Sequence, residues 1–257
     1  MEKITSRNNH IIKDTKKLMN SSAFRQQSRL FVLEGARLCF DVLNSVYTVE
    51  YLLVTEKLCH RYEKEVGDLA AVSGSVYLIS DEIAEKLSDT SSPQGIFAVC
   101  RMEEAAAETG RRVIALDNVQ DPSNVGAMIR TAEALGIDSL LLYRCCDIYN
   151  PKVLRASMGS VLRMCLIPTE NLEATLTEMK NDYAVYATVP DSRAQKIVDI
   201  DFSRPSVCVI GNEANGVEEN IKALSHALIT IPMGGRAESL NASVAASITM
   251  WEMMRND

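Results

Sequence analysis

Apolar and polar positions alternate with two different periods along the first hundred residues. Short apolar runs of the kind found in buried strands occupy residues 29–34, 49–55, 76–79 and 96–100. Helical spacing, with apolar residues every three or four positions, predicts helices at residues 8–19, 36–43, 56–66 and 81–87. This alternation of strands and helices predicts a small α/β domain over residues 1–101.

The second half of the chain alternates in the same way. Strands are predicted at residues 113–116, 139–143, 164–167, 183–188, 207–210 and 228–231. Helices are predicted at residues 125–135, 171–179 and 242–254, with a short helix after Asn150-Pro151 and a polar, irregular segment at 191–204. Residues 102–111 have little apolar patterning, so we expect a linker there, followed by a second domain over residues 112–257.

Composition narrows the class of protein. The chain has 257 residues, of which 47% are hydrophobic, as expected for globular domains. Its apolar runs are too short to span a bilayer and residues 1–7 include no apolar signal segment, so we expect a cytoplasmic protein with no membrane partner. The seven cysteines include no Cys-x-x-Cys and the three histidines are dispersed, so we predict reduced thiols and no metal site.

Charge is distributed unevenly along the chain. The net charge of −7 argues against indiscriminate nucleic-acid binding. Residues 1–37 contain eight Lys or Arg and three Asp or Glu and so carry +5, which leaves −12 for the remaining residues. A basic segment on an acidic protein is consistent with contact to phosphates at one place, and a solvated charged helix has the same composition.

Polar loops follow three predicted strands of the second domain, at residues 117–124, 211–217 and 232–243. In α/β sheets, ligands bind at the carboxyl ends of strands. Pro232 ends its strand because it has no N–H to donate, and Gly234-Gly235 predicts a turn through angles that other residues avoid. Small polar residues before residue 244 then favour the start of the final helix.

Motifs in these loops resemble those of the SpoU/TrmH family of RNA ribose 2′-O-methyltransferases. The chain contains Asn-x-Gly-x-x-x-Arg at 124–130, Gly-x-Glu-x-x-Gly at 211–216, Pro-Met at 232–233 and Ser-Leu-Asn-x-Ser at 239–243. The resemblance covers residues 113–255 and depends on all of these motifs in this order. Ala242 stands where the family usually has valine, which leaves the polar residues on both sides in place.

The resemblance implies a fold and a cofactor. The family belongs to the SPOUT class, so a parallel sheet and a deep trefoil knot are implied for the carboxyl-terminal domain. The implied cofactor is S-adenosyl-L-methionine, held largely by the main chain at Gly211, Ile231 and Leu240. We add Gly216, because glycine permits close approach of the backbone, and Met233 as an apolar wall for adenine. Core positions are the alternative for Ile231 and Leu240.

The amino-terminal half resembles, through weaker landmarks, the substrate-binding domain that precedes many SpoU catalytic domains. The landmarks are Phe31-Val32-Leu33-Glu34-Gly35 and Thr90-Ser91-Ser92-Pro93-Gln94-Gly95-Ile96. That domain is similar to ribosomal proteins that bind kinked RNA, so the resemblance implies a small ribosomal-protein-like α/β domain that binds RNA. Turns with packing roles are the alternative interpretation of both landmarks.

Methyl transfer to a ribose 2′-hydroxyl is an in-line displacement, which requires aligned reactants and removal of the hydroxyl proton, but no metal. The resemblance implies that Arg130 is essential. Because arginine stays protonated in proteins, its role as a base or as an electrostatic stabiliser is left open. We expect Asn124 to orient Arg130 or the ribose, and Glu213 to pair with an arginine, accept hydrogen bonds from loop amides or cap a helix. Ser239 and Asn241 are expected to bind substrate phosphate or hold their loop.

The leading hypothesis is therefore an S-adenosyl-L-methionine-dependent methyltransferase whose partner is RNA, with ribosomal RNA favoured over tRNA. A tRNA methyltransferase and a non-catalytic RNA-binding protein are the alternatives, whereas the lack of Gly-x-Gly-x-x-Gly after any strand argues against a dinucleotide oxidoreductase. The resemblance also implies a homodimer formed through the carboxyl-terminal domain. The helix at 242–254 supports this, because its apolar residues cover more than one stripe, although burial within its own domain is the alternative.

Overall fold

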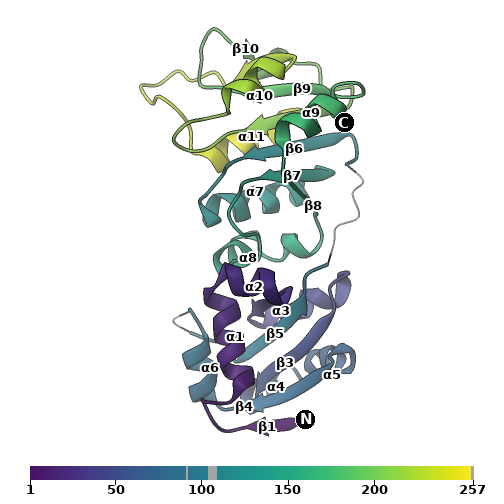
Figure 1. Ribbon diagram of the computed structural model, residues 1–257, viewed down its shortest axis with the longest axis vertical. Coiled ribbons are helices and arrows are strands. Elements are labelled where there is room, and N and C mark those ends of the chain that lie inside the picture. The colour runs from purple at the N-terminus through teal and green to yellow at the C-terminus, as the bar shows by residue number, and fades with distance from the viewer. Residues whose placement is uncertain (91, 104–108, 256–257) are drawn as a thin grey trace. The chain divides into compact units, whose positions relative to one another are not determined.

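Two sheets organise the computed structural model, which describes residues 1–90, 92–103 and 109–255 (Figure 1). Contacts divide the chain into two compact units, which we call unit 1 and unit 2. Unit 1 comprises Met1–Glu104 and Tyr149–Leu162, and unit 2 comprises Ala105–Ile148 and Arg163–Asp257. No helix found within the described residues is long and apolar enough to cross a membrane.

The sheet of unit 1 is mixed, with the strand order β1-β4-β3-β5-β2. Its strands are β1 Glu2–Ile4, β2 Leu30–Glu34, β3 Val49–Thr55, β4 Ser75–Ile79 and β5 Ile96–Arg101. β1, β4 and β3 are parallel, and β5 runs antiparallel to both β3 and β2. The helices of its first segment are α1 His10–Asn20, α2 Ser22–Ser28, α3 Ala36–Asp41, α4 Glu56–Arg61, α5 Glu63–Val72 and α6 Asp81–Leu87, with the 3-10 helix η1 at Val42–Asn44.

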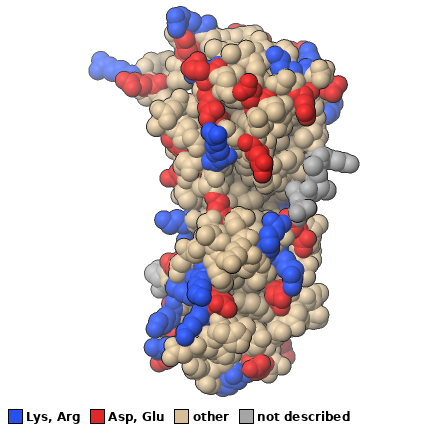
Figure 2. Space-filling view, in the orientation of Figure 1, with Lys and Arg blue, Asp and Glu red and all other residues tan. Residues whose placement is uncertain are grey.

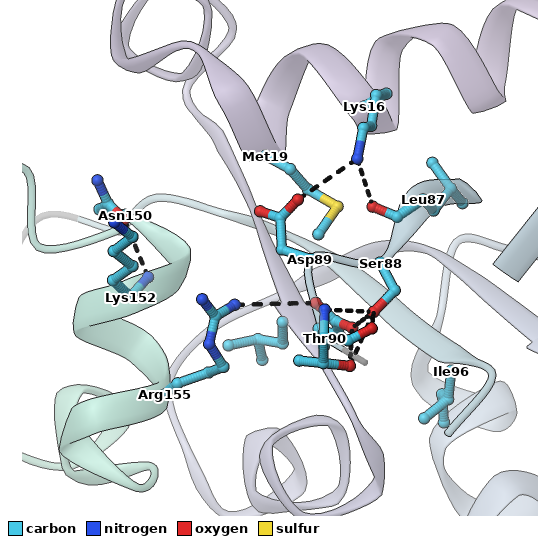
Figure 3. A network of polar contacts seen from close by, with 12 residues as sticks. Lys16, Met19, Leu87, Ser88, Asp89, Thr90, Ile96, Asn150, Lys152 and Arg155 are labelled. Carbon is cyan, nitrogen blue, oxygen red and sulfur yellow. Dashed lines mark hydrogen bonds and ion pairs between the residues drawn. The ribbon is translucent and has the colours of Figure 1, made fainter. Parts of the chain in front are cut away.

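The segment 149–162 belongs to unit 1 by its contacts, although its sequence lies between two strands of unit 2. It contains α8 Pro151–Ser157 and the 3-10 helix η2 at Ser160–Leu162. The Tyr149 ring packs against Phe31 of β2 with centroids 4.4 Å apart, and the Tyr149 and Tyr47 hydroxyls are 3.3 Å apart. Arg155 of α8, labelled in Figure 3, has its Nη1 4.0 Å from Glu34 Oε2. The sequence analysis assigned this segment to the second domain, so the contact-based division differs there.

The sheet of unit 2 is parallel in every pairing among its described residues, as the sequence analysis predicted, with the order β10-β12-β9-β11-β6-β7-β8. Its strands are β6 Arg112–Asp117, β7 Ser139–Tyr143, β8 Cys165–Thr169, β9 Ala184–Thr188, β10 Gln195–Lys196, β11 Ser206–Ile210 and β12 Ala227–Thr230. The helices are α7 Pro122–Leu135, α9 Leu172–Met179, α10 Glu219–Leu224 and α11 Ala242–Met254, with the 3-10 helix η3 at Ile197–Asp199.

Helices cover both faces of this sheet, which explains why its central strands read as continuous apolar runs. Alternate residues of each strand point to opposite faces. Val113 and Ala115 of β6 share a core cluster with residues of α9 and α10. Met128 of α7 and Met250 of α11 are fully buried, and these two helices contact each other. The core of unit 2 therefore holds the carboxyl ends of β6 and β11 in fixed positions.

Most predicted elements are confirmed, and the differences have local causes. α6, β3 and β7 have the predicted bounds, and Ser80, Asn150 and Asn171 cap the helices that follow them. The predicted helix 56–66 was wrong as a single element, because the chain breaks at Tyr62 into α4 and α5. The 191–204 segment, expected to be irregular, contains β10 and η3. β1 and α2 were missed because both are short and lack a clear apolar period.

The predicted domain boundaries stay a prediction. β5 ends at Arg101 and β6 begins at Arg112, so the expected linker at 102–111 lies between the two sheets in the sequence. Its residues 104–108 lie outside the described part of the chain, as does Ser91 of the second landmark in unit 1. The trefoil knot implied by the resemblance also stays a prediction at this point.

Candidate functional site

The strand order of unit 2 reverses between β6 and β11, which are adjacent and parallel. The chain leaves β6 toward β7 on one side, and leaves β11 toward β12 on the other. Connections that depart in opposite directions open a crevice at the carboxyl ends of the two strands, and such a switch point is where open α/β sheets bind ligands. The first and second predicted motifs follow β6 and β11 directly.

Local capping places Asn124 at this crevice. Asp121 is the N-cap of α7, and its Oδ1 accepts hydrogen bonds from the backbone N–H groups of Ser123 and Asn124, at 2.7 and 3.1 Å. Pro122 occupies the first turn, where the missing N–H costs nothing. The helix therefore begins three residues earlier than predicted, and Asn124 lies in its first turn with its side chain free to bond elsewhere.

The loop after β11 is tightly folded around its two predicted glycines. Asn212 and Gly216 exchange backbone hydrogen bonds of 3.1 and 2.9 Å, and Gly216 has a positive φ of 68°. A Cβ on Gly211 would lie 2.1 Å from the carbonyl carbon of Gly216 and 2.2 Å from the Val217 nitrogen. No larger residue fits at 211 unless the loop moves.

The Asn124 side chain joins all three motifs. Its Nδ2 donates to Glu213 Oε1 at 2.9 Å, and its Oδ1 accepts from Asn241 Nδ2 at 3.1 Å. Asn241 is the N-cap of α11, where its Oδ1 accepts from the backbone of Ser243 and Val244. These three side chains, which we call the asparagine bridge, hold the loops after β6 and β11 against the start of α11.

The bridge shows which hydrogen bonds Glu213 and Asn124 make, and their roles in catalysis stay predictions. Glu213 accepts a hydrogen bond from the Asn124 amide, and no ion pair joins it to an arginine in the described part of unit 2. Asn124 bonds to Glu213 and Asn241, and the structure records no hydrogen bond between it and Arg130. Arg130 is exposed on α7, and Ser239 is exposed in the loop before α11. Neither side chain contacts the bridge through a recorded hydrogen bond.

The remaining predicted cofactor residues, Ile231, Met233 and Leu240, lie in or next to an exposed segment. Ile231 follows the end of β12 and is half-buried, as is Leu240, whereas Met233 is exposed. Residues 232–239 between them are all exposed, so their backbone groups are open to a ligand. Gly234 and Gly235 do not adopt positive φ, so the predicted turn through angles reserved for glycine was wrong at these two positions.

Two polar residues of the crevice were missed by the sequence analysis. Asp117, at the end of β6, is fully buried, and its Oδ2 accepts from the Glu218 N–H at 2.9 Å. Burial raises the pKa of Asp117, and the Glu218 hydrogen bond opposes that shift. Asn212 Nδ2 donates to the Asn118 carbonyl at 2.7 Å. An acidic residue ending an otherwise apolar strand was the signal available for Asp117.

The nearby thiols are unsuited to nucleophilic chemistry. Cys145 and Cys146 follow β7 beside the switch point, where burial raises their pKa values to about 11 and about 12. Both therefore stay protonated at neutral pH, and a thiol in that state is a poor nucleophile. The crevice instead offers fixed amide and carboxylate groups, which can bind and orient two reactants for a direct transfer between them.

Comparisons with known proteins agree with this geometry. Residues 111–251 match the model of the SpoU rRNA Methylase family, and residues 9–98 match the MRM3-like substrate binding domain. The 23S rRNA (guanosine(2553)-2′-O)-methyltransferase RlmP of Bacillus subtilis is 33% identical over 255 residues, which cover 98% of this chain and 99% of that protein.

Solved structures resemble the whole chain as well. An AdoMet-bound rRNA methyltransferase from Sinorhizobium meliloti aligns with a TM-score of 0.87 and 28% identity, covering 99% of this chain and 97% of that one. An RNA 2′-O ribose methyltransferase aligns with a TM-score of 0.81 and 28% identity, covering 98% of both chains.

Proposed function

The chain belongs to the SpoU rRNA methylase family, and we propose that it transfers a methyl group from S-adenosyl-L-methionine to a ribose 2′-hydroxyl of ribosomal RNA. The asparagine bridge is the observation that carries the proposal. It unites the three motif loops at the switch point of a parallel sheet, where α/β proteins bind ligands. The ribosomal RNA assignment is supported by the activity named for the Bacillus subtilis relative.

The residues present fit the cofactor. S-adenosyl-L-methionine supplies an activated methyl group when bound. Its adenine needs backbone donors and acceptors at its edge and apolar contacts at its face. The tight Gly211–Gly216 loop offers backbone groups without side-chain bulk, and the exposed Met233 offers an apolar surface. Ile231 and Leu240, both half-buried, complete the proposed set of cofactor-binding residues.

Charge and exposure support the catalytic roles that we propose. Arg130 is exposed and has no ion pair within residues 109–255, so its guanidinium is available to a substrate phosphate or to the developing alkoxide. Glu213 and Asn124 fix the loop geometry through the asparagine bridge. Ser239 is exposed in the Ser-Leu-Asn-x-Ser motif, so its hydroxyl is available to form a hydrogen bond with the RNA.

Methyl transfer to two RNA pools tests the function. Purified protein is incubated with methyl-labelled S-adenosyl-L-methionine and with ribosomal RNA or tRNA from cells lacking the gene. We expect label in one ribose of the ribosomal RNA and none in ribosomal RNA from wild-type cells, whose target is already methylated. Label confined to tRNA would favour the tRNA enzyme, and RNA binding without any transfer would favour a non-catalytic protein.

We further propose a homodimer formed through α11, working in the cytoplasm, with the carboxyl-terminal loops threaded as a trefoil knot. Val244 is 47% and Trp251 56% exposed, and together with half-buried Ile248 they form an apolar stripe at helical spacing. Trp251→Glu should convert a dimer to a monomer in light scattering and lower methyl transfer, whereas Leu228→Glu, at an exposed apolar position on β12, should do neither. A wild-type monomer with full activity would contradict the dimer.

A further inference from the structure

Unit 1 contains a cavity of about 440 Å³ at one edge of its sheet. The cavity lies where β3 ends at Thr55, where α6 begins at Asp81 after β4, and where Gly95 precedes β5. Because β3 and β4 are parallel and β5 is antiparallel to β3, these three positions meet at the same edge. The cavity is as large as typical small-ligand sites and lies at the strand ends where such sites occur in α/β sheets.

The walls of the cavity are well fixed. Thr55 N–H donates to the Gly95 carbonyl at 2.9 Å, and Gly95 has a φ of 80°. A Cβ on Gly95 would lie 2.5 Å from Thr55 Oγ1, so the segments around Gly95 and Thr55 approach each other closely at the base of the cavity. Gln94 Oε1 accepts from the Ala36 N–H at 2.7 Å, which anchors the adjoining loop to α3. A ligand would therefore meet a preformed site.

Unpaired charges of both signs line this cavity. Lys57 and Arg61 of α4 face it together with Asp81 and Glu85 of α6. All four are exposed, and none has an ion pair among the residues that the structure describes. The Arg61 guanidinium lies 5.2 Å from the ring centroid of Tyr62, and that ring packs edge-on against Phe40 with centroids 5.5 Å apart. The cavity thus combines an aromatic ring, supported by Phe40, with four charged side chains that have no ion pair among the described residues.

Several cations of the basic amino-terminal segment are already engaged by the fold. Figure 2 shows Lys and Arg on the visible face of unit 1 with Asp and Glu among them. Lys16 of α1 donates to the Leu87 carbonyl at 2.9 Å and lies 3.5 Å from Asp89 (Figure 3). Lys17 lies 3.6 Å from Asp14, and Arg7 lies 2.7 Å from Glu82. These three cations are therefore weaker candidates for phosphate binding than the composition of the segment suggested.

We propose that this cavity binds one unpaired nucleotide of the RNA substrate. Lys57 and Arg61 contact its phosphate, Tyr62 provides a surface for its base, and Asp81 and Glu85 accept hydrogen bonds from base amino groups or ribose hydroxyls. This assignment rests on the proposed function. The assignment extends the proposed function by naming the residues through which unit 1 selects RNA.

The charge balance favours an unpaired nucleotide over a duplex backbone. A bare duplex backbone would meet repulsion from the two carboxylates, since it offers phosphates and few donors in their reach. An unpaired nucleotide presents one phosphate, hydrogen-bond donors and an aromatic face together, and sequence-specific RNA recognition relies on such splayed nucleotides. Base stacking on an aromatic side chain adds affinity for any base.

Direct RNA binding by the full-length protein tests the assignment. The probe is protein-free ribosomal RNA from cells lacking the gene, and affinity is measured across a range of salt concentrations. Arg61→Ala should weaken binding about tenfold and lower the magnitude of the salt slope by about 1, as expected for one lost phosphate contact. Tyr62→Leu should weaken binding without changing the slope, and Tyr62→Phe should restore it.

Matched controls separate this result from misfolding and from failure of the proposed function. Lys64→Ala removes an exposed cation of α5 that does not line the cavity, and should leave RNA affinity unchanged. S-adenosyl-L-methionine affinity should be the same in all variants. Wild-type RNA affinity and salt slope in both Arg61→Ala and Tyr62→Leu would overturn the assignment, even if methyl transfer is intact. If the variants lose affinity only for whole ribosomal subunits and not for the protein-free RNA, the cavity binds a protein and the nucleotide assignment is overturned. If Arg61→Ala loses RNA binding but the wild-type protein transfers no methyl group, only the proposed function is overturned.

Discussion

The two sheets present polar residues at the ends of parallel strands in opposite ways. At the switch point of unit 2, polar side chains already have partners: those of the asparagine bridge bond to one another, and the Asn212 side chain donates to the backbone carbonyl of Asn118. In the cavity of unit 1, Lys57, Arg61 and the two acidic residues have no ion pairs among the described residues. One set of loops is held in place before any ligand arrives, and the other keeps its charges for a ligand.

This difference matches two kinds of task. Aligning a methyl donor with one hydroxyl requires groups whose geometry is fixed before the ligands bind, because a small misplacement lowers the rate of transfer. Binding a flexible polyanion is better served by charged side chains that are solvated in the unbound protein and can adjust to the ligand, because an unpaired charge on the surface is well solvated by water. Arg130 is the informative exception in unit 2, since it is exposed and has no ion pair among the described residues, although it belongs to the same motif as Asn124.

The largest expected effect tests the fixed geometry of unit 2. Gly211→Val should abolish S-adenosyl-L-methionine binding, a loss of at least about 100-fold or about 2.7 kcal/mol in calorimetry, because the new side chain would collide with Gly216. Gly234→Ala is the control, since a Cβ there meets nothing within 4 Å, and its affinity should match wild type. Unchanged binding in Gly211→Val would place the cofactor elsewhere.

Arg130 should matter for transfer and not for cofactor affinity. Arg130→Ala should lower methyl transfer by about 100-fold or more, as removal of an electrostatic stabiliser does, while calorimetry with S-adenosyl-L-methionine stays unchanged. Arg193→Ala, which removes an exposed arginine paired with Asp191, should leave both unchanged.

Arg130→Lys then separates two roles of the same residue. Lysine keeps the positive charge but loses the planar pair of donors. Near-wild-type transfer in this variant would rule out both a deprotonated arginine base and a bidentate contact.

A smaller effect is expected when the asparagine bridge is broken. In Asn124→Asp, the new carboxylate cannot donate to Glu213 and repels it, so the loops after β6 and β11 should loosen and methyl transfer should fall about tenfold. Asn215→Asp adds the same charge to the loop after β11, which contains Glu213, at a residue whose side chain makes no recorded bond, and its rate should match wild type. Equal losses in both variants would make the charge, and not the bridge, responsible.

The smallest effect concerns α1 and sharpens the contrast within unit 1. Lys16→Ala should lower the free energy of unfolding by about 1 kcal/mol in urea titrations, since it removes the hydrogen bond to the Leu87 carbonyl. Its RNA salt slope should stay near that of wild type. Lys13→Ala, at an exposed position on the same helix, should leave stability unchanged. A flattened salt slope in Lys16→Ala would restore the basic segment as an RNA contact.

Local chemistry explains what could be predicted. Most strands of both sheets, the starts of the helices after Ser80 and Asn150, and the helix end at Gly136 with its φ of 76° depend on residues that are close in the sequence. The three motif loops were found for the same reason, since each directly follows an apolar strand. Elements without a period of their own, such as β1 and α2, gave no such signal.

Tertiary structure decided how these pieces meet. Asn124 bonds to residues 89 and 117 positions away, and those partners depend on β11 lying beside β6 and on α11 beginning next to both loops. The cations of residues 1–37 looked alike in the sequence, yet Arg25 is buried with its Nη1 bonded to the Leu18 carbonyl. Lys57 and Arg61, which lie outside that basic segment, line the cavity and have no ion pair among the described residues. A side chain's own residue type sets what it can bond to, but only the packing of distant segments sets whether that bond is already made.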